Sequence, residues 1–88
     1  MSISPAQCRA ARALIEMDQA ELARRAVVTR DMIADFENGI RTPAADSLVA
    51  IRKALEAAGV EFLDENGGGE GVRRKKRGAF GNLIGYEP

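Results

Sequence analysis

Apolar side chains along residues 5–58 recur at intervals of three and four positions, which is the pattern of short amphipathic helices. The first expected helix follows Ser4, which can form a capping box with Gln7, while Pro5 suits the first helical turn. Its buried face is expected to hold Cys8, Ala11, Leu14 and Ile15. The chain is therefore predicted to begin with a helix that packs on a core.

Two more short helices are predicted on either side of a tight turn. Asp18 suits the cap of a helix from Gln19 to Ala26. Val27-Val28 forms the turn, and Thr29 is the expected cap of a helix that ends at Asn38-Gly39. The expected buried side chains of this pair are Leu22, Ala23, Ala26, Ile33 and Phe36.

A fourth helix is predicted to open at Thr42-Pro43 and to end at Gly59. Its expected apolar stripe consists of Leu48, Val49, Ile51, Leu55 and Ala58. Beyond this helix, strand-like runs at Val60–Leu63 and Val72–Lys76 flank the glycine-rich segment 66–71. The fold class is thus predicted to be mainly α, four helices with a short C-terminal β-ribbon.

A two-stranded ribbon is marginally stable by itself, so this one must pack on the helices or pair with a second chain. Because an open strand edge favours pairing with another chain, we expect a homodimer built partly through residues 60–76.

Composition excludes several kinds of chemistry. The chain has 88 residues, room for one small core, and contains one Cys and no His. Cys8 is therefore expected to be a buried, inert thiol, and no metal site or cofactor is expected. The glycine run 67–69 does not precede a helix with Lys and Ser or Thr, as a phosphate loop would, and an enzyme is disfavoured. Neither a signal peptide nor a membrane span is recognisable, so we expect a cytoplasmic protein.

The net charge is zero, but the charges are segregated along the chain. Residues 1–63 carry eight basic and nine acidic groups, residues 64–70 carry three acidic groups, and residues 71–88 carry five basic groups and one acidic group. A local positive surface is compatible with this distribution.

The segment from Gln19 to Pro43 reads QAELARRAVVTRDMIADFENGIRTP. It resembles the helix-turn-helix of the Xre-type, lambda-repressor-like regulators of bacteria and phages, and the resemblance covers about residues 7–58. It implies a DNA-binding domain that reads double-stranded DNA. The family usually has Gly at the turn position that Val27 occupies here. Since a β-branched residue is disfavoured at positive φ, the turn must adopt a negative-φ variant or carry strain.

The same resemblance implies an ion pair between Arg12 and Glu37, which would link the first helix to the end of the third. The alternative is that both are solvated surface charges. We favour the pair, as a device that fixes orientation rather than as a source of net stability.

In a helix-turn-helix, the second of the two helices enters the major groove and the first crosses the phosphate backbone. The face of the third helix away from the core holds the base-reading candidates Thr29, Arg30, Asp31 and Ala34. Arg30 suits guanine, Asp31 suits a cytosine amino group and Ala34 suits a thymine methyl. Thr29 is also a cap, and Asp31 is equally explained as a partner of the helix dipole.

The resemblance adds backbone-contacting positions. Gln19 matches a family position that contacts the DNA backbone, and the loop from Asn38 to Arg41 matches one that grips phosphates. Asp31, Asp35 and Glu37 make the reading helix acidic, which predicts low non-specific affinity.

The basic run Arg73, Arg74, Lys75, Lys76 and Arg77 is predicted to contribute phosphate contacts, beside the groove or as a separate arm. Its alternative role is that of a charged strand edge that opposes aggregation.

The sequence thus divides into a helix-turn-helix domain (1–59), a ribbon expected to dimerise (60–77), and a flexible or partner-docking tail (78–88). We expect a transcriptional regulator, more specifically a repressor, that binds a near-palindromic operator as a homodimer. The alternative is an adaptor or antitoxin-like protein that mainly binds a regulatory protein partner through residues 60–88.

Overall fold

A computed structural model of the chain describes residues 2–65 and 67–75. These residues form the helices α1 (Pro5–Leu14), α2 (Gln19–Ala26), α3 (Arg30–Glu37) and α4 (Ala45–Ala57), followed by the strands β1 (Val60–Leu63) and β2 (Gly71–Arg74). The predicted fold class, four helices followed by a short ribbon, is confirmed.

Side-chain caps set the starts of the first three helices. Ser4 and Gln7 form the expected capping box at α1, and Asp18 and Thr29 accept hydrogen bonds from backbone amides at the starts of α2 and α3. Each cap satisfies an amide that has no partner inside its helix. The predicted bounds of α2 agree with the structure for this reason.

Two predictions for the fourth helix were wrong: the residue at which it begins and one member of its apolar stripe. The helix α4 begins at Ala45, two residues beyond Thr42-Pro43, and Ala44 makes no side-chain cap. Val49, which was expected in the apolar stripe, is 49% exposed. Leu48, Ile51 and Leu55 already occupy the buried face at three- and four-residue spacing, and Val49 points away from it.

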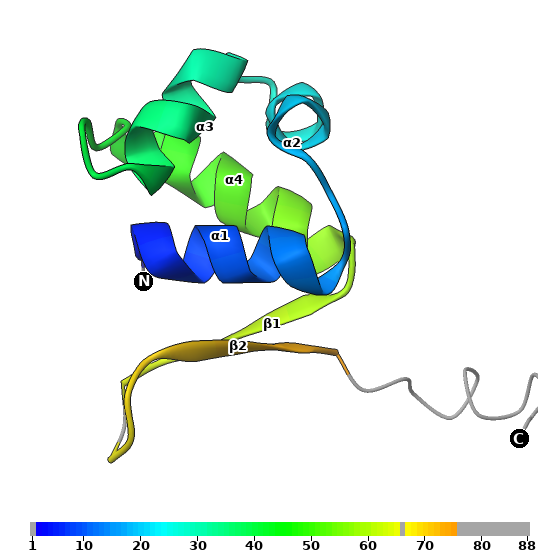
Figure 1. The fold of residues 1–88 in the computed structure, drawn as a ribbon, viewed down its shortest axis with the longest axis vertical. Coiled ribbons are helices and arrows are strands. Elements are labelled where there is room, and N and C mark those ends of the chain that lie inside the picture. The colour runs from blue at the N-terminus through cyan, green and yellow to red at the C-terminus, as the bar shows by residue number, and fades with distance from the viewer. Residues whose placement is uncertain (1, 66, 76–88) are drawn as a thin grey trace, which may run out of the picture.

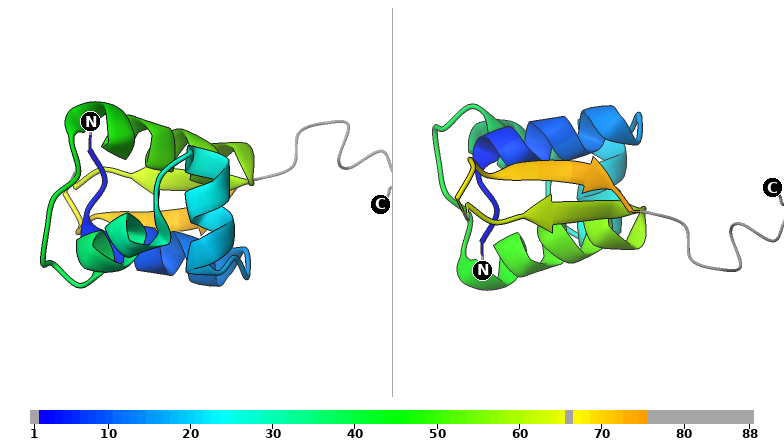
Figure 2. Two further views of the ribbon diagram at one scale, coloured as in Figure 1. Left: turned by 90° about the horizontal axis from the view of Figure 1, so that it is seen from above. Right: turned by 90° about the horizontal axis from the view of Figure 1, so that it is seen from below.

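The elements are arranged in three levels, as Figure 1 shows: α2 and α3 at one end, α1 and α4 in the middle, and the sheet at the other end. Figure 2 shows the sheet lying against α1 and α4, with β2 beside α1 and β1 beside α4. The sheet and the helix α3 are thus on opposite sides of the α1–α4 pair.

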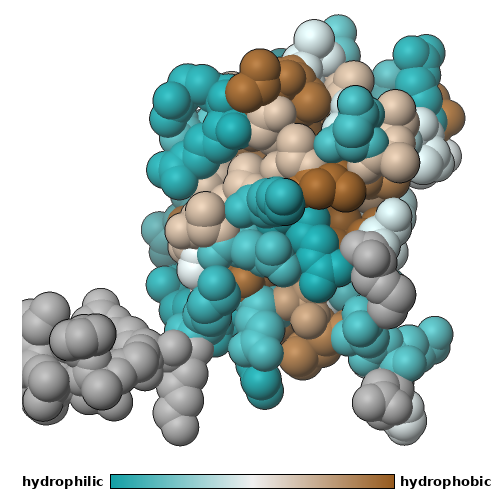
Figure 3. Space-filling model, turned by 180° about the vertical axis from the view of Figure 1, so that it is seen from behind, coloured by the Kyte–Doolittle hydropathy of each residue, from teal (hydrophilic) through white to brown (hydrophobic). Residues whose placement is uncertain are grey.

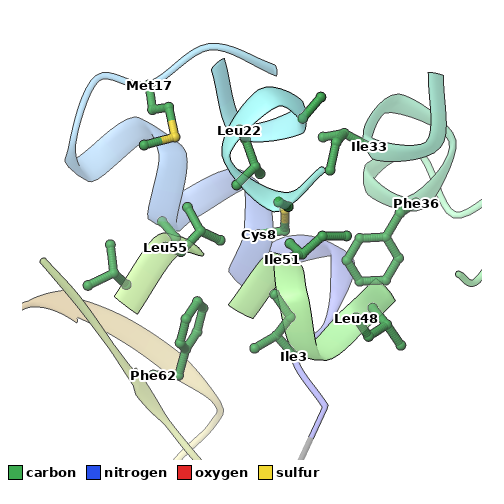
Figure 4. Close-up of a cluster of buried hydrophobic side chains, with 14 residues drawn as sticks. Ile3, Cys8, Met17, Leu22, Ile33, Phe36, Leu48, Ile51, Leu55 and Phe62 are labelled. Carbon is green, nitrogen blue, oxygen red and sulfur yellow. The ribbon is translucent and has the colours of Figure 1, made fainter. Parts of the chain in front are cut away.

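One core connects the three levels (Figure 4). Leu22, Ile33, Ile51 and Leu55 are completely buried at its centre, and Phe62 extends it from the sheet. Most of these side chains are aliphatic, as expected for a chain with few aromatic residues.

The ribbon packs on the helices of its own chain. The strands are antiparallel, with Val60 opposite Arg74 and Phe62 opposite Val72, and the buried Val60 and Phe62 point into the core. The side-chain amide of Gln7, in α1, donates to the carbonyls of Leu63 (3.2 Å) and Gly71 (3.0 Å). The first of the two predicted ways to stabilise the ribbon is therefore realised within one chain.

Candidate nucleic-acid interface

The turn between α2 and α3 keeps the left-handed geometry that the family usually builds with glycine. Val27 has φ 58° and ψ 48°, and the amide of Val28 donates to the carbonyl of Ala23 at 3.0 Å, as in a glycine-type helix end. The Val27 side chain is 88% exposed, so burial does not compensate for this conformation. Of the two outcomes that the sequence allowed, the strained turn is the one observed.

The helix α3 presents a polar face to solvent. Ile33 and Phe36 are buried, whereas Arg30 and Asp31 are exposed at the N-terminal end and Ala34 is half-buried. Thr29 is exposed and its hydroxyl accepts from the amide of Met32 at 3.1 Å. The four base-reading candidates therefore lie on or beside one accessible helix end.

Two surface depressions connect this face to its neighbours. One is lined by Arg12, Asp18, Gln19, Ala20 and Arg30, and the other by Thr29, Asp31, Met32, Asp35, Arg41, Thr42, Pro43 and Ala44. The structure thus brings Gln19 to one side of α3 and Arg41 to the other.

The loop after α3 is fixed to the end of that helix. Gly39 has φ +73°, and the amides of Ile40 and Arg41 both donate to the carbonyl of Asp35, at 2.8 and 3.3 Å. Asn38 and Arg41 are exposed on this loop. Their side chains are therefore held close to the reading helix rather than on an independent segment.

A buried carboxylate holds α1, α2 and α3 in their relative positions. Glu37, the last residue of α3, is 2% exposed and accepts a forked pair of hydrogen bonds from Arg12, Nη2 to Oε1 at 2.6 Å and Nε to Oε2 at 2.7 Å. Gln19 donates to Oε1 at 3.0 Å, and the Cys8 thiol donates to Oε2 at 3.1 Å. The ion pair between Arg12 and Glu37 is confirmed, and it includes partners that the sequence analysis missed.

The missed partners carried only a weak signal in the sequence. Cys8 was expected on the buried face, and it is buried, but nothing in its spacing indicated a carboxylate partner. Gln19 was considered only as a DNA contact. Its amide instead has one donor committed to Glu37, which fixes the side chain at the N-terminus of α2.

The surroundings of Glu37 shift the pKa of two groups. Burial opposes the charge of Glu37, but the hydrogen bonds from Arg12, Gln19 and Cys8 outweigh burial and lower its pKa. Burial, followed by the hydrogen bond to Glu37, raises the pKa of the Cys8 thiol far above its ordinary value. Glu37 is therefore charged but neutralised by Arg12, and, because it is buried, it does not add to the acidic surface that the sequence analysis expected on the reading helix. Among the charges of that acidic helix, Asp31 is exposed and Asp35 is half-buried.

The basic run lies away from α3. Arg73 pairs with Glu61 at 3.0 Å on the outer side of the sheet, and Arg74 donates to the carbonyl of Leu14. Lys75 donates to the carbonyl of Glu56 at 3.2 Å. Two of the three cations thus bind carbonyls at the C-terminal ends of α1 and α4, where positive charge is favoured. Lys76, Arg77 and the predicted tail 78–88 lie outside the described residues.

The arrangement is that of a DNA-binding regulator of the helix-turn-helix class. A family model described as helix-turn-helix matches residues 9–62. The chain belongs to this family, the Xre-type, lambda-repressor-like DNA-binding regulators. No curated protein matches the chain.

Within residues 2–65 and 67–75, no His, Cys, Asp and Glu side chains gather in a group of three that could hold a metal ion. None of the helices in this part of the chain has the length and apolar character needed to cross a membrane.

Proposed function

We propose that this regulator is a repressor that reads a specific DNA sequence with the N-terminal end of α3. The observation that carries the proposal is the surface formed by the exposed Arg30 and Asp31 and the half-buried Ala34, with Gln19 on one side and Arg41 on the other. Such a helix end reaches base edges in the major groove. Bound there, the protein would exclude other proteins from the same DNA.

Arg30 is the base-reading residue that we rank first. Its guanidinium has the forked donor geometry that suits the O6 and N7 acceptors of guanine. It is exposed at the start of α3 and lines the same depression as Gln19. Asp31 also lies in the first turn, where an acidic side chain complements the helix dipole, so its contribution to base reading is secondary.

Phosphate contacts are assigned to the two sides of α3. Gln19 is half-exposed and, although it donates to Glu37, its amide has a second N–H group for a backbone oxygen. Asn38 and Arg41 occupy the opposite side, on the loop fixed to Asp35. Arg73–Lys75 lie across the bundle from α3, so the phosphate contacts predicted for them require a second duplex.

The proposed operator is near-palindromic and is bound by a homodimer, with half-site centres about 34 Å apart, one turn of DNA. A dimer through residues 60–77 meets this requirement in only one way. Because α3 lies on the side of the bundle away from the sheet (Figure 1), the two sheets must join edge to edge about an axis perpendicular to the sheet. Packing of the two outer sheet faces would direct the α3 helices in opposite directions.

Selection of bound sequences from a random duplex pool tests this proposal. The native chain should enrich a palindromic consensus. Arg30→Ala should lose preference at one position of each half-site, at a cost of about 1–3 kcal/mol, because a forked arginine contact discriminates one base. The control is Lys53→Ala, which removes an exposed cation from α4 and should leave the consensus unchanged.

If Arg30→Ala gives the native consensus, the assignment of Arg30 is wrong. If the native chain enriches no sequence, the proposal that the protein recognises a specific DNA sequence is wrong. The alternative of an adaptor that mainly binds another protein then gains support. Sedimentation at increasing protein concentration tests the dimer separately, because a monomer both free and on DNA would contradict it. Truncation after Gly59 would not serve this purpose, since it removes the buried Val60 and Phe62 from the core.

A further inference from the structure

The outer edge of β2, on the side away from β1, is open in the described part of the chain. The amide of Lys75 donates to the carbonyl of Gly59 at 2.6 Å, and from there every second pair along the observed ladder is hydrogen-bonded. This alternation directs the N–H and C=O groups of Glu70, Val72 and Arg74 away from β1. Within residues 2–65 and 67–75, no turn or loop backbone pairs with them. The edge can therefore accept another strand.

The side chains of these three residues lie on the α1 side of the sheet. Glu70 accepts a hydrogen bond from the Ser4 hydroxyl at 2.7 Å, at the start of α1, and Arg74 donates to the carbonyl of Leu14, at the end of α1. Val72 lies between them and packs on the core. The edge thus carries an acid at one end, an apolar side chain in the middle and a base at the other end.

We propose that the homodimer forms by antiparallel pairing of β2 with β2 of a second copy, with the two-fold axis at Val72. This interface rests on the homodimer of the proposed function and adds its strand, its register and its contacts. Glu70 of each copy faces Arg74 of the other, and the open backbone groups of all three residues pair across the interface. Both α3 helices remain on the side of the bundle away from the joined sheet (Figure 1).

Charge selects this register from the others that the ladder allows. A shift that sets open groups against groups directed to β1 would leave them unpaired, so the alternatives place the axis at Gly71, Arg73 or Arg74. An axis at Arg73 or at Arg74 makes the two copies of that arginine direct neighbours, which is destabilising. An axis at Gly71 sets Arg74 opposite Gly68 and loses both ion pairs. Only the axis at Val72 joins opposite charges at both ends.

The helix α1 lies beside this interface and must leave room for a second copy. Figure 2 shows α1 extending beyond β2 on this side. A groove of about 150 Å³ lies between α1 and β2, and the exposed Ala6 and Ala10 line its helix side. Helices with such small side chains at their contact can approach to about 8 Å between their axes. The two α1 helices can therefore lie side by side over a four-stranded sheet.

The exposed apolar residues do not form a competing interface in the described part of the chain. Val27, Ile40 and Val49, the large apolar side chains that are well exposed there, lie on the α2–α3 turn, the α3–α4 loop and α4. Figure 3 shows apolar areas separated by hydrophilic side chains on one face of the molecule. Backbone hydrogen bonds and charge at the β2 edge are therefore the features that favour a second copy.

Charge reversal at the two ends of β2 tests this pairing in the full-length chain. In a homodimer of Glu70→Lys or of Arg74→Glu, both facing pairs join like charges. Sedimentation equilibrium should show dimerisation weakened about thirtyfold for each variant, because two attractive cross-strand pairs become repulsive. An equimolar mixture of the two variants should form a heterodimer with native affinity, since both facing pairs again join opposite charges. The double variant, Glu70→Lys with Arg74→Glu, should recover its homodimer for the same reason.

Two matched controls accompany these variants. Glu65→Lys makes the same change of charge at an exposed residue in the connection between the strands and should leave dimerisation unchanged. Ala10→Gln should weaken dimerisation by separating the two α1 helices, whereas Ala57→Gln, at the exposed end of α4, should not. Circular dichroism should remain native in every variant. The comparison of Glu70→Lys with Glu65→Lys decides the interface even if Arg74→Glu disturbs the contact with Leu14.

The outcomes separate this interface from the proposed function. A native dimer that Glu70→Lys weakens no more than Glu65→Lys would overturn the interface, while the proposed homodimer would stand on another surface. A mixture that dimerises no better than its separate components would overturn the register. A native chain that stays monomeric at every concentration would also overturn the interface. Enrichment of a palindromic consensus from the random duplex pool would in each case still support the proposed operator.

Discussion

Replacing Val27 by glycine should stabilise the protein, because Val27 occupies a left-handed conformation that a β-branched residue tolerates poorly. The residue has φ 58° and ψ 48°. For a residue other than glycine, this conformation costs about 1–2 kcal/mol. Glycine loses more backbone entropy on folding, which offsets about 0.5–1 kcal/mol. Since the Val27 side chain is 88% exposed, its removal sacrifices little buried surface.

The net gain expected for Val27→Gly is therefore about 0.5–1 kcal/mol in the free energy of unfolding, or roughly 2–8 °C in Tm for a domain of this size. Urea and thermal unfolding, followed by circular dichroism, measure both quantities. Val27→Ala should gain less, because it removes the branch at Cβ but keeps Cβ itself.

Two controls separate backbone strain from a general effect of glycine. Val28→Gly should destabilise the protein, since Val28 packs on the core and is not among the residues with positive φ. Gly39→Val should also destabilise it, because Gly39 has φ +73° and its missing Cβ would meet open space, so strain is the main change. A neutral or destabilising effect of Val27→Gly, with native circular dichroism, would refute the reasoning.

The remaining predictions concern the Glu37 cluster and the basic run. Arg12→Ala leaves a buried carboxylate without its cation and should cost about 3–5 kcal/mol and weaken DNA binding; an unchanged melting curve would contradict this. Because the pKa of Glu37 is lower in the folded than in the unfolded chain, its contribution to stability is complete above the ordinary glutamate range and is lost as the pH falls through the folded-state pKa. Glu37→Gln should reduce the dependence of Tm on pH across that acidic range, and an unaltered profile would assign the dependence to other groups. The buried Cys8 thiol should react with a thiol reagent only when the chain unfolds, so reaction that is fast under native conditions and insensitive to urea would disprove its burial. Replacing Arg73–Lys75 by Ser should leave the salt dependence of DNA binding unchanged, because these residues lie across the bundle from α3; a slope shallower by about 3 would show that they contact phosphate.

Local chemistry made the first three helices predictable. A Ser, Asp or Thr cap acts on amides two or three residues away, so its effect is visible in a short stretch of sequence. The start of α4 was misplaced because Thr42-Pro43 imitates a helix start, while the actual start at Ala45 has no side-chain cap to reveal it. The Arg12 and Glu37 pair was predicted through family resemblance, since the two residues are far apart in the chain and no local rule joins them.

By itself, the sequence determined the fold class, the helix-turn-helix and the existence of the ribbon, because these depend on periodicity, caps and turns within a few residues. Only the tertiary structure decided which charges are accessible. It buried Glu37 among Arg12, Gln19 and Cys8, and it placed Arg73–Lys75 on the side of the bundle opposite α3. It also showed that Val27 keeps the positive φ of the glycine it replaces. The backbone hydrogen bond from the amide of Val28 to the carbonyl of Ala23 sets the conformation of Val27, and packing between distant segments sets the accessibility of the charges. The local sequence pattern encodes neither this hydrogen bond nor this packing.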